Sequence, residues 1–192
     1  MKKKVIILLF IVILLIGGYF MFFKKEEKEP IKVGNKVLVV YYSATGSTKR
    51  VSEVIKNNLN ADIFEIIPED IYTSSDLNYN DENSRVYKEY KDTSKRDVKL
   101  KEYSLDLTKY DTILIGYPIW WGVSAWPVNT FVKDNDFTGK TIIPFCTSVS
   151  SSLGESAKLL EGISNGGNWQ EGKRFSSYVN EEDIKAWTDS IK

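Results

Sequence analysis

Two kinds of hydrophobic pattern alternate along the chain after residue 35. Continuous apolar runs, typical of strands that are buried on both faces of a sheet, occur at residues 36–42, 61–67, 111–118 and 140–148. Between and after them, apolar residues recur at helical spacing in residues 51–59, 127–134, 154–163 and 180–192. The segment 168–175 can supply a short fifth strand, and a polar stretch over residues 68–101 is predicted to hold one helix near residues 81–91.

The regular alternation of strands and helices predicts an α/β fold with a parallel sheet and helices on both faces. In such a sheet, ligands bind at the carboxyl ends of the strands. The loops that follow the first, third and fourth strands are therefore the segments in which functional residues are expected.

The first 30 residues have a different pattern. Val5 to Phe23 is a run of 19 residues without a charge. At about 1.5 Å per residue, a helix of this length approaches the roughly 30 Å hydrocarbon core of a bilayer. A cleaved signal peptide has a shorter apolar run and a small-residue cleavage site, whereas here the run continues past Gly17 and Gly18. We therefore expect an uncleaved N-terminal membrane anchor (a signal anchor) over residues 1–30, a tether over residues 31–35, and one domain over residues 36–192.

The orientation of this single-pass helix depends on its flanking charges. Lys2, Lys3 and Lys4 favour an N-terminus inside the cell, which places the soluble domain on the extracytoplasmic side of the cell membrane. Further lysines, two of them at Lys24 and Lys25, flank the other end of the run and leave the opposite orientation open.

Composition excludes several classes of chemistry. The chain has no histidine, which rules out Ser-His-Asp triads and makes a zinc site improbable. Its single cysteine, Cys146, forms no internal disulfide and is expected to be a core residue. The first 30 positions hold six of the 26 basic and three of the 26 acidic residues, so the rest of the chain has a net charge of −3. We expect neither a nucleic-acid partner nor a metal, and any redox work requires a bound cofactor.

The loop after the first strand is rich in hydroxyl groups. Ser43, Thr45, Ser47 and Thr48 surround Gly46, directly before a predicted helix. The free N–H groups and partial positive charge of a helix N-terminus attract anions such as phosphate, and glycine lets the backbone approach a ligand closely. The loop matches neither the Walker pattern nor the dinucleotide fingerprint, and a loop that only caps its helix remains the alternative.

Two further loops are predicted at the same edge. Residues 116–127 place Trp120 and Trp121 between glycines and prolines, and aromatic rings there can stack on a flat ligand or cover the sheet edge. Residues 147–154 add more hydroxyls after the fourth strand. Together the three loops suit a ligand with a phosphate tail and a planar polar head.

These three loops resemble those of the flavodoxin-like family. The segment Ser43-Ala44-Thr45-Gly46-Ser47-Thr48 resembles its phosphate loop, "GYPIWWG" (116–122) the second flavin loop of a bacterial flavodoxin subgroup, and "PFCTSVSSSLGES" (144–156) the third. The resemblance covers about 80% of the chain. It implies a doubly wound, five-stranded parallel sheet of order 2-1-3-4-5 and noncovalently bound FMN.

The resemblance also assigns cofactor-binding residues and no catalytic side chain. The phosphate would be held by Ser43, Thr45, Gly46, Ser47 and Thr48. The isoalloxazine ring would lie along Pro118, Ile119, Trp120 and Trp121, and Thr147 and Ser148, with the turn towards Gly154, would edge it. Ala44 and Gly122, within the same loops, are also expected to be cofactor-binding residues. The third loop departs from the pattern of electron-transfer flavodoxins, because Val149 and serines stand where an aromatic residue often covers the outer ring face.

Three functions follow as hypotheses. The first is a membrane-tethered FMN protein that transfers electrons to or from a redox partner protein or a quinone. The second is an FMN-dependent oxidoreductase, an NAD(P)H-dependent quinone or flavin reductase, which an open ring face would favour. The third is a degenerate flavodoxin fold that binds no flavin and serves as an interaction module, which the serine run in the third loop would favour.

Overall fold

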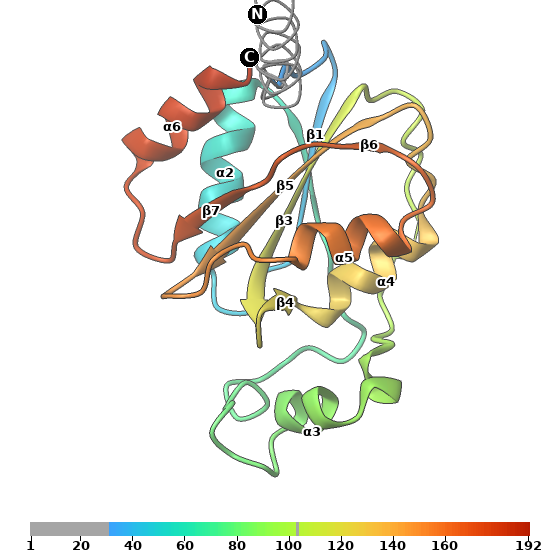
Figure 1. Ribbon diagram of the computed structural model, residues 1–192, viewed down its shortest axis with the longest axis vertical. Coiled ribbons are helices and arrows are strands. Elements are labelled where there is room, and N and C mark those ends of the chain that lie inside the picture. The colour runs from blue at the N-terminus through green and yellow to red at the C-terminus, as the bar shows by residue number, and fades with distance from the viewer. Residues whose placement is uncertain (1–30, 103) are drawn as a thin grey trace, which may run out of the picture. The chain divides into compact units, whose positions relative to one another are not determined.

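A mainly parallel β-sheet forms the centre of the computed structural model, which describes residues 31–102 and 104–192 (Figure 1). The sheet has the order β2-β1-β3-β5-β6, while β7 also pairs with β5 and the short β4 runs antiparallel to β3. The strands are β1 (Val37–Tyr41), β2 (Asp62–Glu65), β3 (Thr112–Trp120), β4 (Val123–Ser124), β5 (Thr141–Ser148), β6 (Asn168–Trp169) and β7 (Lys173–Ser176). The α/β class and the parallel sheet expected from the sequence are confirmed.

The strand count differs from the expected five, because the described residues form seven strands. The predicted fifth strand is split into β6, which pairs with the start of β5, and β7, which pairs with its end. The break lies beside Pro144, which has no N–H to donate, and a Cβ on Gly172 would lie only 3.0 Å from the proline ring. The remaining extra strand, β4, is the short return of a hairpin.

Helices cover both faces of the sheet (Figure 1). On one face lie α2 (Ser47–Leu59) and α6 (Glu181–Ser190), and on the other α4 (Trp126–Asp134) and α5 (Ser156–Ile163). Successive residues of β1 point to opposite faces, so Val37 and Val39 pack with α2 and α6 while Leu38 and Val40 pack with α4 and α5. The expected helix start at Asn180 is confirmed, since its side chain accepts a 2.8 Å hydrogen bond from the backbone N–H of Asp183.

The third strand is longer than expected. It continues past Pro118, where the predicted run ended, as far as Trp120. Gly116 is required inside the sheet because a Cβ there would come within 2.3 Å of the ring of Phe145, which is fully buried on β5. The ring of Phe145 therefore fills the place of the missing side chain.

The segment between β2 and β3 forms an insertion beyond the carboxyl ends of the strands (Figure 1). It contains α3 (Arg85–Lys91) and a short 3-10 helix, η1 (Thr93–Arg96). The helix begins at residue 85 rather than near 81, because Ser84 is the N-cap and its hydroxyl accepts a 3.2 Å bond from the backbone N–H of Tyr87.

The predicted anchor, residues 1–30, lies outside the described residues. Among residues 31–102 and 104–192, no helix is long and apolar enough to cross a membrane. Residues 31–35 were expected to be a tether, but the backbone N–H of Val33 bonds to the carbonyl of Ile191 at 2.7 Å and that of Gly34 to Thr112 Oγ1 at 2.8 Å. Ile31 and Val33 also pack against the core beside α6, so this segment is part of the domain.

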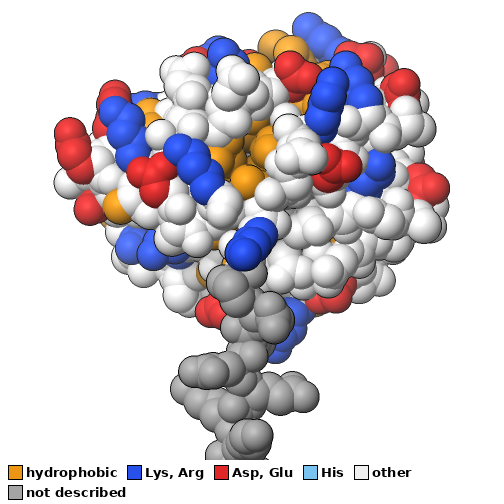
Figure 2. Space-filling view, turned by 90° about the horizontal axis from the view of Figure 1, so that it is seen from above, with side chains coloured by type: hydrophobic (Ala, Val, Ile, Leu, Met, Phe, Trp, Pro, Cys, Tyr) orange, Lys and Arg blue, Asp and Glu red, His pale blue; other side chains and the backbone are white. Residues whose placement is uncertain are grey.

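Figure 2 looks onto the end of the domain opposite α3. Basic and acidic side chains are interspersed over this face, with a few apolar side chains between them. The visible described residues therefore present no continuous patch of one sign at this end.

Candidate functional site

The loop between β1 and α2 is shaped for an anion. Gly46 is the N-cap of α2 with a left-handed backbone (φ 90°), and its N–H donates to Ser43 Oγ at 3.1 Å. The first backbone bond of the helix runs from Arg50 N to the carbonyl of Gly46 at 3.0 Å. The N–H groups of residues 47–49 therefore have no partner within the helix, and its first turn contains no acidic residue.

The adjacent tryptophans belong to a tight hairpin. Trp120 is the last residue of β3 and pairs with Val123 of β4. Trp121 and Gly122 form the two-residue turn between them, both with positive φ (46° and 81°), as a type I′ turn requires. A non-glycine residue in this conformation is uncommon, so the tertiary contacts of Trp121 must hold it there.

The ring of Trp121 has aromatic neighbours on both α4 and the insertion. Trp126 of α4 lies nearly parallel to it, with centroids 6.5 Å apart and an interplanar angle of 11°. The ring of Tyr90 on α3 lies parallel to Trp121 with centroids 4.6 Å apart and an interplanar angle of 9°. Trp120 instead meets Tyr42 and Tyr72 edge to face, with centroid distances of 5.8 and 5.1 Å. One face of Trp121 is thus already occupied by a residue more than 30 positions earlier in the chain.

The third loop begins inside β5, which ends at Ser148. Arg174 on β7 holds it from behind: its Nε donates to Ser148 Oγ at 3.1 Å, and its Nη2 donates to the carbonyls of Ser148 and Val149 at 3.1 and 3.0 Å. The Ser148 hydroxyl in turn donates to the carbonyl of Ser151. This loop is therefore fixed by a cationic side chain that the sequence analysis did not single out.

A cavity of about 400 Å³ opens between these three loops. Nine of the fourteen predicted site residues line it: Ala44, Thr45, Ser47, Pro118, Ile119, Trp120, Trp121, Thr147 and Ser148. Its size falls within the roughly 300–1,000 Å³ range of small-molecule sites. The other walls come from Leu77, Tyr79, Val86, Val149 and Ser177, which were not predicted as site residues.

The five remaining predicted residues do not line the cavity, although they lie close to it in the chain. Ser43 and Gly46 shape the first loop, and Thr48 is buried with its Oγ1 2.8 Å from Thr147 Oγ1. Gly122 and Gly154 have positive φ, and a Cβ on Gly154 would lie 3.9 Å from the carbonyl oxygen of Gly122. The third loop therefore passes close to the hairpin turn at Gly154.

Three buried titratable side chains that adjoin the three loops in the sequence stay uncharged at neutral pH. Burial raises the pKa of the Tyr42 and Tyr117 hydroxyls above their ordinary value. Burial likewise raises the pKa of the Cys146 thiol to about 12, although the nearby Arg174 opposes this shift. Cys146 is fully buried, as expected for a core residue, and the described residues contain no cluster of side chains that could hold a metal.

The donor set fits one kind of ligand. Uncharged hydroxyls and free N–H groups at the start of α2 suit a phosphate ester. The wall that Ile119, Trp120 and Trp121 form beside them suits a flat heterocycle. FMN joins these two parts in one molecule, and the residues present are of the right type to hold it.

Comparison with known proteins agrees with this description. The family model of the flavodoxins matches residues 36–191. A protein from Bacteroides uniformis, whose crystal structure is described as that of a flavoprotein, is 39% identical to this chain, with a TM-score of 0.75. The match covers 81% of this chain and 99% of the Bacteroides uniformis protein. A Bacteroides eggerthii protein of the same description is also 39% identical to this chain, with a TM-score of 0.72. The match covers 81% of this chain and 97% of the Bacteroides eggerthii protein.

A more distant structure shares the fold. It is a flavoprotein from Lactobacillus acidophilus in complex with FMN, which is 20% identical with a TM-score of 0.53 and covers 81% of this chain and 99% of its own. No protein of curated function matches the chain significantly. The family match over residues 36–191 and the identity to the two Bacteroides proteins place the chain in the flavodoxin family.

Proposed function

We propose that this chain is a membrane-tethered FMN protein that transfers electrons. The observation that carries the proposal is the cavity of about 400 Å³ between the α2 N-terminus and the tryptophan hairpin, because it joins a site for a phosphate to an aromatic wall. FMN is the cofactor that the flavodoxin family and this donor set have in common. Bound FMN supplies the redox chemistry, since it accepts and releases one or two electrons.

The residues of the chain hold and orient this cofactor. Thr45 and Ser47 line the cavity beside the free N–H groups of α2, and they would donate hydrogen bonds to the phosphate. Ile119, Trp120 and Trp121 line the cavity as well and would shield the ring from water. Thr147 and Ser148 line the cavity from the end of β5, where Arg174 holds the loop and adds a positive charge behind it.

The uncharged run from Val5 to Phe23 supports the tether, and its N-terminal lysines support an extracytoplasmic position for the domain. A quinone or a membrane-bound redox protein is then the partner. In cell fractionation, the full chain is expected with the membranes, whereas a chain of residues 31–192 is expected in the soluble fraction. Recovery of the full chain in the soluble fraction would contradict the tether.

The second candidate is an NAD(P)H-dependent quinone or flavin reductase. It is favoured by the third loop, where Val149 is 68% exposed and lines the cavity in place of an aromatic residue. An uncovered ring would let a nicotinamide lie against it. A yellow protein that oxidises no NAD(P)H with any quinone would rule against this candidate.

The test uses residues 31–192. This part is expected to fold by itself, because the Bacteroides relatives correspond to it over 97–99% of their length, and the two hydrophobic cores of the described residues lie within it. Incubation with FMN followed by gel filtration should give a yellow protein with a flavin absorbance band. A colourless protein would contradict the proposal and favour a non-flavin interaction module.

The variant Thr45→Val tests where the phosphate binds. Loss of the hydrogen bond from the Thr45 hydroxyl to the phosphate should weaken FMN binding by about 1–3 kcal/mol. Thr93→Val, at an exposed threonine of η1 outside the cavity, is the matched control and should leave the dissociation constant unchanged. An unchanged constant in Thr45→Val would contradict the phosphate assignment.

A further inference from the structure

The outer wall of the cavity comes from a segment that the flavin-loop motifs do not include. Leu77 and Tyr79 line the cavity from the turns between β2 and α3, and Val86 lines it from the first turn of α3. Tyr79 is 66% exposed although its ring is large and largely apolar. An exposed aromatic ring at the rim of an apolar cavity is placed to cover a flat ligand.

Successive turns hold Tyr79 in a defined position. The Asp76 carboxylate accepts from the backbone N–H and the hydroxyl of Thr73 at 2.8 and 2.6 Å, and these bonds lower the pKa of Asp76. The N–H groups of Leu77 and Asp81 bond to the carbonyls of Thr73 and Asn78 at 3.2 and 3.1 Å. Tyr79 therefore lies within a bonded run of turns rather than on a free loop.

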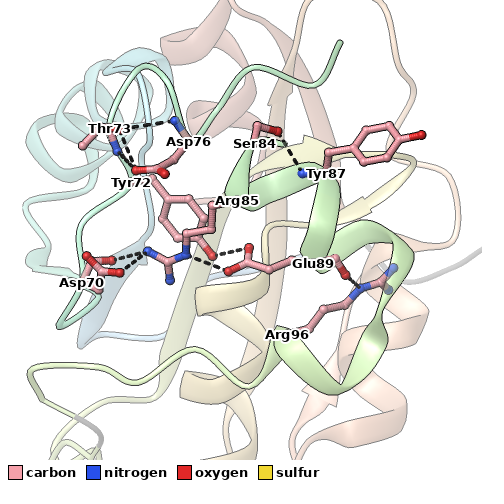
Figure 3. Close-up of polar contacts among 9 residues, drawn as sticks. All are labelled: Asp70, Tyr72, Thr73, Asp76, Ser84, Arg85, Tyr87, Glu89 and Arg96. Carbon is pink, nitrogen blue, oxygen red and sulfur yellow. Dashed lines mark hydrogen bonds and ion pairs between the residues drawn. The ribbon is translucent and has the colours of Figure 1, made fainter. Parts of the chain in front are cut away.

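A partly buried ion-pair network anchors these turns to α3 (Figure 3). Arg85 Nε bonds to Glu89 Oε1 at 2.8 Å, and the Tyr72 hydroxyl bonds to Glu89 Oε2 at 2.7 Å. The Arg85 guanidinium also lies 3.9 Å from the centroid of the Tyr72 ring and forms a 3.1 Å ion pair with Asp70. At the other end, the backbone N–H of Val86 bonds to the carbonyl of Asp76 at 3.0 Å.

We infer that Tyr79 covers the outer face of the bound isoalloxazine ring, in the place left open by the third loop. The inference rests on the proposed function and adds the residue that closes its site. The third loop contributes Val149 to the cavity lining, and this residue has no ring to stack, whereas Tyr79 has an exposed aromatic ring. The cofactor is then enclosed between the tryptophan hairpin and the insertion.

This arrangement has a consequence for the reaction. In hydride transfer, C4 of NADH gives a hydrogen with two electrons to a ring that lies parallel to it; NADH becomes NAD⁺, and a proton from water completes the reduction. Such a transfer needs an open ring face. Tyr79 over that face would keep a nicotinamide away from the ring, so direct reaction with NADH would be slow.

The experiment compares four forms of residues 31–192, namely the unaltered domain, Tyr79→Ala, Tyr79→Phe and Tyr178→Ala. Tyr178 is the matched control because it is 82% exposed and follows the cavity residue Ser177 without lining the cavity itself. Three properties are measured: the FMN dissociation constant, the fluorescence of bound FMN, which a stacked tyrosine quenches, and the rate of anaerobic reduction by NADH.

Tyr79→Ala is expected to bind FMN roughly tenfold more weakly, to fluoresce more in the bound state and to be reduced faster by NADH. Tyr178→Ala lies outside the cavity and should match the unaltered domain in all three properties. Tyr79→Phe keeps the ring and should match it in affinity and in NADH reduction, whereas its bound fluorescence should rise because phenylalanine has no phenol to quench the flavin. If Tyr79→Ala matches the unaltered domain in bound fluorescence and affinity, or if Tyr79→Phe binds FMN as weakly as Tyr79→Ala, the inference is wrong. A colourless unaltered domain would instead overturn the proposed function, so the two failures are distinguishable.

Discussion

The hydroxyl oxygens of Thr48 and Thr147 lie 2.8 Å apart in a buried position. Thr48 is in the first turn of α2, and Thr147 is near the end of β5, 99 residues later. Their bond ties the loop between β1 and α2 to the third loop. Both residues were expected to contact FMN, but only Thr147 lines the cavity. The contact of Thr48 is with Thr147, so its expected role is to hold the Thr147 side chain in place.

Thr48→Val should therefore destabilise the domain. It leaves the Thr147 hydroxyl without this partner in a site that is 3% exposed, and the expected loss in the free energy of unfolding is about 1–3 kcal/mol. Urea unfolding of the single variants and of Thr48→Val/Thr147→Val completes a double-mutant cycle. The double variant should lose less than the sum of the two singles, and strict additivity would show that the bond contributes nothing.

Arg174 is expected to control FMN affinity from behind the third loop. Arg174→Gln removes three hydrogen bonds to Ser148 and Val149, so the loop loses its fixed position and the dissociation constant should rise about tenfold, or ~1.4 kcal/mol. Lys173→Gln makes the same charge change at an exposed position of β7. Titration of FMN should show the loss only in Arg174→Gln, whereas equal losses in both variants would indicate a general effect of charge.

Glu89 is expected to stabilise the insertion. Glu89→Gln removes the negative charge that faces Arg85 and accepts from the Tyr72 hydroxyl, which should lower the free energy of unfolding by about 1–3 kcal/mol. Glu82→Gln, at an exposed position five residues before Tyr87, is the control and should cost far less. Equal unfolding curves for the two variants would mean that the buried network adds no stability.

Cys146 should resist alkylation in the folded domain. Burial raises its pKa from an ordinary value of 9.0 to about 12, so the reactive thiolate is scarce and the side chain is also inaccessible. Iodoacetamide at pH 8 should modify it only after unfolding in urea. Rapid modification of the native domain would show that the thiol is reachable.

The same shift predicts how stability depends on pH. Since the folded-state pKa is the higher one, the unfolded chain loses the Cys146 proton first as pH rises. The contribution to stability is complete below about pH 9 and is lost as pH rises towards 12. Burial raises the pKa values of Tyr42 and Tyr117 in the same direction, so urea unfolding should show stability falling from pH 9 upwards.

Local pattern was sufficient for most elements of the domain. Continuous apolar runs marked β1, β3 and β5, and helical spacing marked α2, α4, α5 and α6, because burial on one or two faces leaves a periodic trace in the sequence. The three loops that line much of the cavity were found from their hydroxyls, glycines and tryptophans. The predicted start of the last helix at residue 180 is confirmed, and the bond that caps it spans only three positions.

The contacts that escaped prediction join residues far apart in the chain. Nothing near Trp121 indicates that Tyr90 will stack on it, and nothing near Ser148 indicates that Arg174 will hold it. The polar insertion has no periodic pattern that would show which of its tyrosines reaches the cavity. These pairings depend on how β-strand order and the turns before α3 bring distant segments together.

The sequence by itself determined the alternation of strands and helices, the family and the three loops at one edge of the sheet, because each depends on neighbours within a few residues. Only the tertiary structure decided that the fifth strand splits beside Pro144, that the Thr48 hydroxyl bonds to Thr147, and that Tyr79 lines the cavity. Those features depend on which side chains, far apart in the sequence, pack into the same space in the folded chain. Local periodicity contains no information about such contacts.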